Sequence, residues 1–226
     1  MSVAGGKGLV VELTNYGAGI RRIGHPTAEG YDCRDVVLGY DDREEYEGRY
    51  QGSIVGRVAN RINKGRFTLD GKTHQVDLNA GGKHHLHGGK NGFSHRFWDC
   101  KPVPNGVQFM LTSREGDQWY PGAVDVKVTY TLVENDRKGA NVWDLRVKME
   151  GDLVGDKATP INLTNHASFN LEGHNTQEQL NYHSLQMDCD AFTPVDEDLI
   201  PTKKVQYFAK DGPDYLDFRV ERKLGR

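Results

Sequence analysis

The chain has few cysteines, no long apolar run and no excess of charge of one sign. Its three cysteines, Cys33, Cys100 and Cys189, are odd in number and far apart, so they form neither a Cys-x-x-Cys pair nor an evident disulfide framework. This usage favours a reducing compartment, and we expect a cytoplasmic protein. No apolar run is long enough to span a bilayer, and the stretch from Met1 to Leu13 lacks the basic and apolar regions of a signal peptide.

The charges of the 226 residues nearly balance, with a net charge of −3 and both signs interspersed. We therefore predict no nucleic-acid partner, because no basic stripe is present. Helical periodicity is weak, and only residues 41–47 predict a short helical turn. The 27 glycines and 8 prolines fit many turns between short strands and argue against a helical bundle.

Alternation of apolar and polar residues predicts an all-β protein. Residues 124–132 alternate in this way, and residues 143–149 repeat the pattern after a polar loop, so we expect an antiparallel pair of strands. Asp70-Gly71 and Pro104-Asn105-Gly106 lie between alternating runs and predict tight turns. The sequence therefore predicts a large antiparallel β-sandwich, with residues 1–226 forming a single domain.

A histidine lies in the middle of a polar stripe. From Ile161 to Leu171 the residues alternate, which predicts one strand with a core face and a hydrogen-bonding face. His166 belongs to the hydrogen-bonding face, between hydroxyl and amide side chains. Such an imidazole suits a site that holds a hydroxyl-rich ligand and moves a proton near neutral pH. An exposed polar face with an idle histidine explains this segment equally well.

A second polar cluster contains Asn60 and Arg61, just before the predicted hairpin at Asp70-Gly71. The guanidinium of Arg61 is a rigid fork of donors suited to sugar hydroxyls or to a carboxylate. The alternative is a surface arginine paired with one of the 32 acidic residues.

His84, His85 and His87 fall within four residues and raise the possibility of a metal site. No further ligand follows at finger-like spacing, so we predict neither a metal nor another cofactor. The two glycines after His87 predict a turn that another part of the chain approaches closely, which makes His87 a candidate hydrogen-bond partner or proton carrier. Trp119-Tyr120 supplies aromatic faces suited to a sugar ring or to the core.

Several motifs together resemble the aldose 1-epimerase (galactose mutarotase) family, in the family's order and approximate spacing. They are Gly56-Arg57-Val58-Ala59-Asn60-Arg61-Ile62, Leu86-His87-Gly88-Gly89, Tyr120-Pro121-Gly122, Thr159-Pro160-Ile161-Asn162-Leu163-Thr164-Asn165-His166, Phe169-Asn170-Leu171 and Pro194-Val195-Asp196. The resemblance implies a mutarotase-like supersandwich with a sugar cleft on one sheet. It also implies interconversion of the α and β anomers of galactose or glucose.

The resemblance assigns the site residues. His166 is the implied acid at the ring oxygen, and Asn60, Arg61 and His87 bind the sugar, with His87 as the second catalytic candidate. A base removes the proton of the C1 hydroxyl, the ring opens, the aldehyde turns, and the ring closes as the other anomer, so only proton transfers and positioning are needed.

The family's base is a glutamate that falls beyond Arg226, so we expect a fold that is incomplete at the C-terminus and impaired activity. Glu172 falls on the same face of the expected strand as His166. Six residues along a strand separate the two by roughly 20 Å, which is too far to act across one sugar ring. Glu115, Asp117 and Glu197 lie in no matching motif.

Two other functions stay open at this point. One is a non-catalytic hexose-binding or sensing protein. The other is an enzyme for phosphorylated hexoses, which needs cationic groups such as Arg57, Arg61 and Arg96 around the phosphate. In each case the expected partner is a small hexose rather than a membrane, and we expect a monomer or a weak dimer.

Overall fold

The computed structural model describes residues 2–4, 8–27, 30–135, 142–176, 181–210 and 212–224. Met1 and Arg226, named above, lie outside the described residues. The chain divides into two compact units, Met1–His174 and Asn175–Arg226, each of which is described by itself. The single-domain organisation expected from the sequence stays a prediction.

The strong alternation of residues 124–132 produces the central strand of a four-stranded antiparallel sheet. Its strands, in spatial order, are β10 (Asp99–Val103), β11 (Gly106–Ser113), β12 (Ala123–Asn135) and β13 (Val142–Val154). The predicted antiparallel pairing of β12 with β13 is confirmed along their whole length, from Ala123 opposite Val154 to Asn135 opposite Val142. The apolar residues of β12 are buried on one face, as a strand of period two requires.

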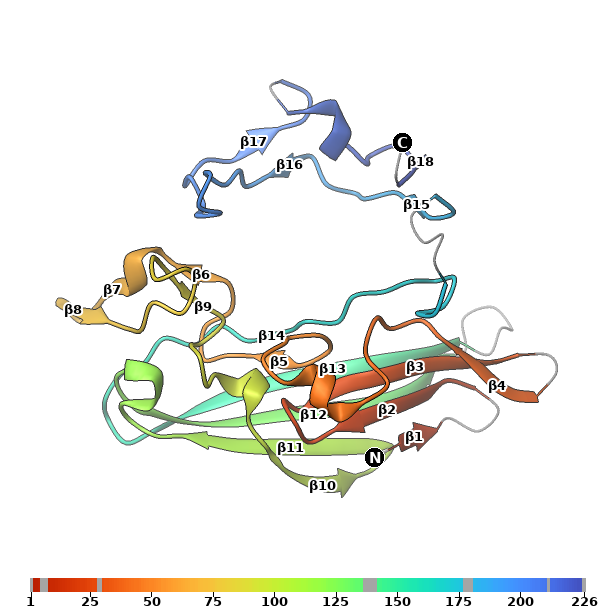
Figure 1. Ribbon diagram of the computed structural model, residues 1–226, viewed down its shortest axis with the longest axis horizontal. Coiled ribbons are helices and arrows are strands. Elements are labelled where there is room, and N and C mark those ends of the chain that lie inside the picture. Colours follow the sequence, from red (N-terminus) through yellow and green to blue (C-terminus); the bar gives the residue numbers. More distant parts are fainter. Residues whose placement is uncertain are drawn as a thin grey trace. The chain divides into compact units, whose positions relative to one another are not determined.

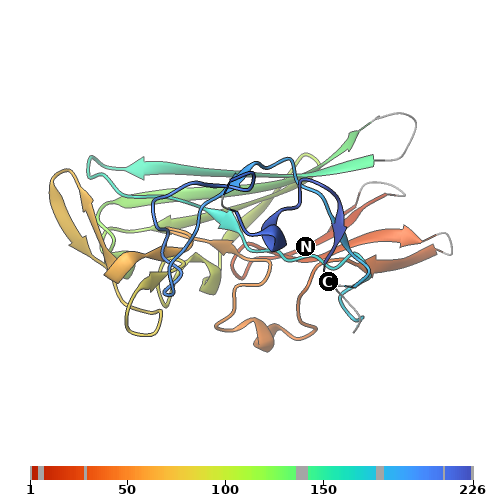
Figure 2. The ribbon, with the colours of Figure 1, turned by 90° about the horizontal axis from the view of Figure 1, so that it is seen from above.

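A second antiparallel sheet contains β1 (Ser2–Ala4), β2 (Val10–Thr14), β3 (Gly19–Thr27) and β4 (Gly30–Asp35). Buried residues of β2 and β3 share one hydrophobic core with those of β11 and β12, for example Val11, Ile20, Phe109 and Val128. In both views the strands of the two sheets run in roughly the same direction (Figures 1 and 2). The predicted all-β antiparallel sandwich is therefore confirmed.

The predicted turns are also confirmed. Asp70 and Gly71 have φ values of 50° and 72° and join β7 (Arg66–Leu69) to β8 (Lys72–Gln75). Asn105, with φ 56°, turns the chain between β10 and β11. The short helical turn expected near residue 45 is the 3₁₀ helix η1 (Arg43–Tyr46).

The remaining helical elements are also single 3₁₀ turns: η2 (Asn63–Gly65), η3 (Phe93–His95), η4 (Asp117–Trp119) and η5 (Asp214–Leu216). A search of the described residues for a helix of the length and hydropathy of a membrane span finds none.

Two very short strand pairs carry the polar motifs of the first unit. β5 (Ile54–Val55) pairs with β14 (Thr164–Asn165), and β6 (Arg61–Ile62) pairs with β9 (His85–Leu86). Each pair brings together segments that are distant in the sequence, and residues just outside these strands become neighbours.

The expected single strand from Ile161 to Leu171 is wrong. Only Thr164–Asn165 is a strand, Phe169 and Leu171 are exposed, and the side chain of Asn170 is buried at 2% exposure. The reason is local hydrogen bonding by asparagine side chains. Asn165 Oδ1 accepts from the backbone N–H of Ala167 at 2.9 Å, which turns the chain and ends the alternation.

The second unit contains two further strand pairs. β15 (Ser184–Leu185) pairs with β18 (Arg222–Lys223), and β16 (Ala191–Phe192) pairs with β17 (Gln206–Tyr207). The rings of Phe192 and Phe208 stack at 5.4 Å within this unit.

Candidate functional site

A groove open to solvent, with a volume of about 530 Å³, lies over the short strands of the first unit. Most of its lining side chains bear amides, hydroxyls or imidazoles. The lining residues are Ala59, Asn60, His87, Asn162, Leu163, Thr164, Asn165, His166, Ala167 and Ser168. Three of the four predicted site residues thus line one groove, which offers hydrogen bonds rather than apolar contact.

Asn60 and His87 are locked to each other at one end of the groove. Because β6 and β9 are antiparallel with Arg61 opposite Leu86, the residue before β6 faces the residue after β9. The backbone N–H of Asn60 donates to Nδ1 of His87 at 3.0 Å, and the backbone N–H of His87 donates to the oxygen of Asn60 at 3.1 Å. Both residues have left-handed backbones, with φ 62° and 53°, a strain typical of functional sites.

The bond from Asn60 sets the chemical form of His87. Since Nδ1 accepts a hydrogen bond, the proton of the neutral ring lies on Nε2, which is left to donate to a ligand. Burial, the His166 ring and the Arg61 guanidinium lower the pKa of His87 to about 4. At neutral pH His87 is therefore an uncharged hydrogen-bond donor.

The second imidazole of the groove, His166, is held by its backbone. Its N–H donates to the oxygen of Ser53 at 2.9 Å, and its oxygen accepts from the N–H of Gly52 at 3.1 Å, which continues the pairing of β14 with β5. Within the described part of the chain its ring forms no hydrogen bond, so both nitrogens are available to a ligand. The rings of His166 and His87 lie 5.3 Å apart at an angle of 90°.

Arg61 lies beside this pair rather than among the lining residues. Its Nη1 is 3.4 Å from Oδ1 of Asn60, and among the described residues it forms no ion pair with a carboxylate. The described residues thus provide no acidic partner for Arg61, and its positive charge lies next to His87.

His85 lies in β9, is buried, and bridges two other segments. Its Nδ1 lies 2.9 Å from the backbone oxygen of Asp77, with Oδ1 of the same residue at 2.7 Å, and its Nε2 lies 2.7 Å from the hydroxyl of Tyr120. Because a carbonyl oxygen only accepts, Nδ1 carries a proton, and in the neutral ring Nε2 accepts from the Tyr120 hydroxyl. Asp77 also reaches the turn after His87 through the N–H of Lys90 at 3.4 Å. This buried polar chain fixes β9, and with it His87.

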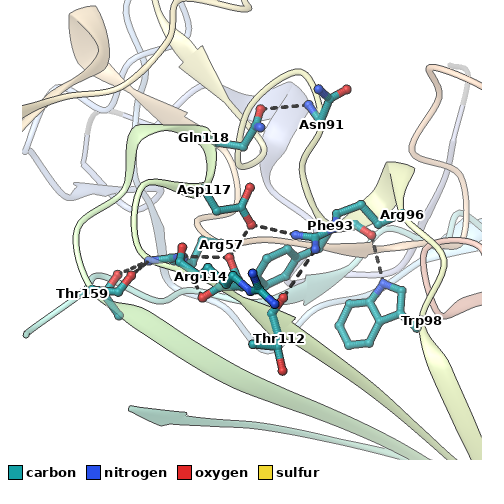
Figure 3. A network of polar contacts seen from close by, with 12 residues as sticks. Arg57, Asn91, Phe93, Arg96, Trp98, Thr112, Arg114, Asp117, Gln118 and Thr159 are labelled. Atoms are coloured by element: carbon teal, nitrogen blue, oxygen red, sulfur yellow. Dashed lines mark hydrogen bonds and ion pairs between the residues drawn. The ribbon is translucent and has the colours of Figure 1, made fainter. Parts of the chain in front are cut away.

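Arg57 is the centre of a hydrogen-bond network, which is drawn in Figure 3. Its guanidinium is 1% exposed and donates to the hydroxyls of Thr159 and Ser113 and to the backbone oxygens of Ser113, Arg114, Pro121 and Gly122. Arg96 is paired with Asp117 at 2.7 Å. The phosphate-binding role considered for Arg57 and Arg96 is therefore wrong, because both side chains are already occupied.

The Gly88-Gly89 turn is approached closely by another part of the chain, as its two glycines predicted. Gly88 has φ 84°, and a Cβ there would overlap the backbone oxygen of Gly56. The backbone before Arg57 thus passes directly against the turn after His87, and only glycine permits this approach.

Comparison with known proteins shows the family to which the chain is similar. The aldose 1-epimerase family model matches residues 1–226. The galactose mutarotase of Sus scrofa is 40% identical over 199 residues, which cover 87% of this chain and 54% of the pig protein. The aldose 1-epimerase of Escherichia coli is 33% identical over 216 residues, which cover 94% of this chain and 59% of that enzyme.

The chain belongs to the aldose 1-epimerase family. A solved structure of a GalM/aldose epimerase homologue from C. elegans superposes with a TM-score of 0.84 at 32% identity, covering 99% of this chain and 65% of that one. The galactose 1-epimerase of Lactobacillus acidophilus superposes with a TM-score of 0.80 at 29% identity, covering 98% and 61%. The chain spans little more than half the length of the sequence relatives it matches.

The three histidines that suggested a metal are each engaged elsewhere. Nδ1 of His84 accepts from the backbone N–H of Lys64 at 3.1 Å, His85 bridges Asp77 and Tyr120, and Nδ1 of His87 accepts from Asn60. No group of three potential ligands suited to a metal ion occurs in the described ranges.

Trp119 and Tyr120 could each have contacted a sugar or packed in the core, and the two residues differ in burial. Tyr120 is buried, whereas Trp119 is 71% exposed. Sequence reasoning missed Tyr50 and Asp77, which adjoin the site. Tyr50 lies outside the alternating runs, and Asp77 is an ordinary polar position between Val76 and Leu78, so neither residue signals this position.

No carboxylate lines the groove in the part of the chain that the structure describes. Glu115 is paired with Lys157 and Asp117 with Arg96. Glu172 lies 4.0 Å from Arg34, and Glu197 belongs to the second unit. The groove therefore supplies donors and imidazoles but not the base that the resemblance implies.

The lowered pKa of His87 predicts a loss of stability in acid. An unfolded histidine has a pKa near ~6.5, so unfolding takes up a proton between that pH and about 4. The stabilisation is complete above pH ~6.5 and is lost as the pH falls to about 4; for this half-exposed ring it amounts to ~1–2 kcal/mol. Urea unfolding at pH 7 and pH 4.5 measures the loss, and His87→Gln is expected to reduce the difference by that amount.

Proposed function

We propose that the groove binds an aldohexose, galactose or glucose, and that the chain acts on its anomeric centre as an aldose 1-epimerase. The observation that carries this proposal is the pair of perpendicular imidazoles, His87 and His166, on a groove lined with amides and hydroxyls. The family membership and the likeness to the galactose mutarotase of Sus scrofa support the same substrate class.

In this proposal the two imidazoles have different roles. His166, whose ring nitrogens are free to meet a ligand, gives a proton to the ring oxygen as the C1–O5 bond breaks and takes it back on closure. His87 stays neutral and donates from Nε2 to a sugar hydroxyl, which revises its expected role as a second proton carrier. Asn60 and Arg61 complete the hydrogen bonding and favour negative charge developing on the sugar.

The missing partner is a base for the proton of the C1 hydroxyl. Since no groove-lining residue among those described is a carboxylate, water takes that proton in our proposal, and turnover is slow. General acid–base catalysis contributes about 10²- to 10⁴-fold per group, so we expect a rate at least ~100-fold below that of a full-length relative.

Polarimetry of freshly dissolved α-D-galactose, with NMR titration of the same sugar, tests this proposal. We expect saturable galactose binding and a small rate that is proportional to protein concentration. Binding without any such rate indicates the hexose-binding or sensing alternative. Absence of binding refutes the proposal. A rate equal to that of a full-length enzyme refutes the statement that no group of this chain acts as the base.

We also propose a cytoplasmic location, from the sparse and unpaired cysteines, and a monomeric or weakly dimeric state. Sedimentation across a concentration range checks the second point.

A further inference from the structure

Tyr50 lies among three imidazoles. Its ring centroid is 4.7 Å from that of His87 in an edge contact, 6.0 Å from that of His166 in a stacked contact and 5.0 Å from that of His95. It is therefore in ring contact with both imidazoles of the groove, and the ring planes of those two histidines are perpendicular to each other.

The backbone around Tyr50 holds the same histidine that its ring stacks on. The oxygen of Tyr50 accepts from the N–H of Ser53 at 3.0 Å and from its hydroxyl at 2.7 Å, forming a tight turn. That turn presents the N–H of Gly52 and the oxygen of Ser53 to the backbone of His166. The ring and main chain of one short segment thus fix His166 from two directions.

His95 supports Tyr50 from a third direction. Its Nδ1 lies 3.1 Å from the oxygen of Lys90, and its Nε2 lies 3.2 Å from the oxygen of Arg49. His95 therefore lies between the turn that follows His87 and the residue that precedes Tyr50, and its neutral ring donates to one of these two oxygens. This connection ties the tyrosine ring to the His87 end of the groove.

Tyr50 is not a member of the hydrophobic core. It is half-buried, and it is absent from the set of residues that pack between the two sheets. Burial and the nearby carboxylate of Asp77 raise the pKa of its hydroxyl, so the ring stays uncharged at neutral pH. An uncharged, flat side chain between imidazoles orients them without adding a charge to the site.

We propose that Tyr50 is a positioning residue of the hexose site, whose ring holds the imidazoles of His87 and His166 perpendicular to each other. The substrate part of this inference rests on the proposed function, while the orientation of the two rings does not. Without the ring, each imidazole gains freedom about its side-chain torsions and the groove gains water beside His87. A displacement of about 1 Å in a positioning group costs roughly a hundredfold in rate.

The test compares Tyr50→Leu, which removes the ring, with Tyr50→Phe, which removes only the hydroxyl. A matched control is Phe192→Leu, because Phe192 stacks on Phe208 at 5.4 Å in the second unit, whereas both groove imidazoles belong to the first. Imidazole NMR signals are titrated with acid in the absence of sugar, and galactose affinity is measured separately. We expect Y50L to raise the pKa of His87 by at least ~1 unit and to weaken galactose binding about tenfold.

We expect Y50F to match the unsubstituted chain in both measurements, and F192L to leave the signals of both groove imidazoles unchanged. If Y50L leaves the titration of His87 and the shifts of both groove imidazoles unchanged, the positioning role is overturned. If Y50L moves those signals but the unsubstituted chain binds no galactose, the positioning stands and the proposed substrate falls. Should Y50L fail to fold, Tyr50→Met carries the same expectations.

Discussion

Replacing Arg57 with methionine is expected to destabilise the chain by about 4 kcal/mol, a large part of the ~5–15 kcal/mol that stabilises a typical folded protein. Methionine fills similar volume but donates no hydrogen bond. The guanidinium donates to four backbone oxygens and two hydroxyls, and in the variant these buried acceptors lose their donor. The loss also affects the groove, because Arg57 lies three residues before Asn60.

Urea unfolding and thermal melting measure this effect. At roughly 2–4 °C per kcal/mol, the melting temperature of R57M is expected to fall by about 8 °C or more. Arg57→Lys restores a charge and at most ~3 donors, so it is expected to be intermediate. The matched control is Arg66→Met, an exposed arginine bonded to Gln75, which is expected to cost below ~1 kcal/mol. Stability of R57M within ~1 kcal/mol of the unsubstituted chain would show that the network contributes little.

The sheets were predictable because their determinants are local. Residues 124–132 alternate strictly, and nothing in that segment competes with the strand, so β12 forms with its apolar residues buried. The same pattern failed at residues 161–171. There the side chains of Asn165 and Asn170 bond to nearby backbone groups and replace strand pairing with turns, which alternation alone does not reveal.

The candidate site was predictable only in part. Asn60, His87 and His166 were candidates from their polar segments, the family resemblance assigned their roles, and the pairing of β6 with β9 and of β5 with β14 brings them together. The role of Arg57 was not predictable, since its acceptors lie between 56 and 102 residues further along the chain. Tyr50 was missed for the same reason: its importance comes from three rings gathered by tertiary structure.

Replacing His166 with glutamine is expected to abolish the protein-dependent rate of anomer interconversion, a loss of at least ~100-fold. Glutamine keeps a hydrogen-bond donor of similar reach but cannot hold and return a proton at neutral pH. The ring of His166 forms no hydrogen bond within the described residues and is half-exposed, so the fold is expected to lose less than ~1 kcal/mol. Galactose affinity is expected to fall tenfold or less, because one hydrogen bond contributes only ~1 kcal/mol.

Rate and affinity are expected to separate because the proton at the ring oxygen is needed only as the ring opens, whereas the groove binds the closed sugar mainly through its other donors. His74→Gln is a fair control, since His74 lies in β8 and stacks on Phe67 rather than facing the groove. A full protein-dependent rate in H166Q would assign the proton transfer to another group. His87 would be an unsuitable replacement, because its Nδ1 is bonded to Asn60 and its pKa of about 4 keeps it neutral where the reaction is measured. In our proposal, His166, whose two ring nitrogens form no hydrogen bond within the described residues, is therefore the residue that transfers the proton.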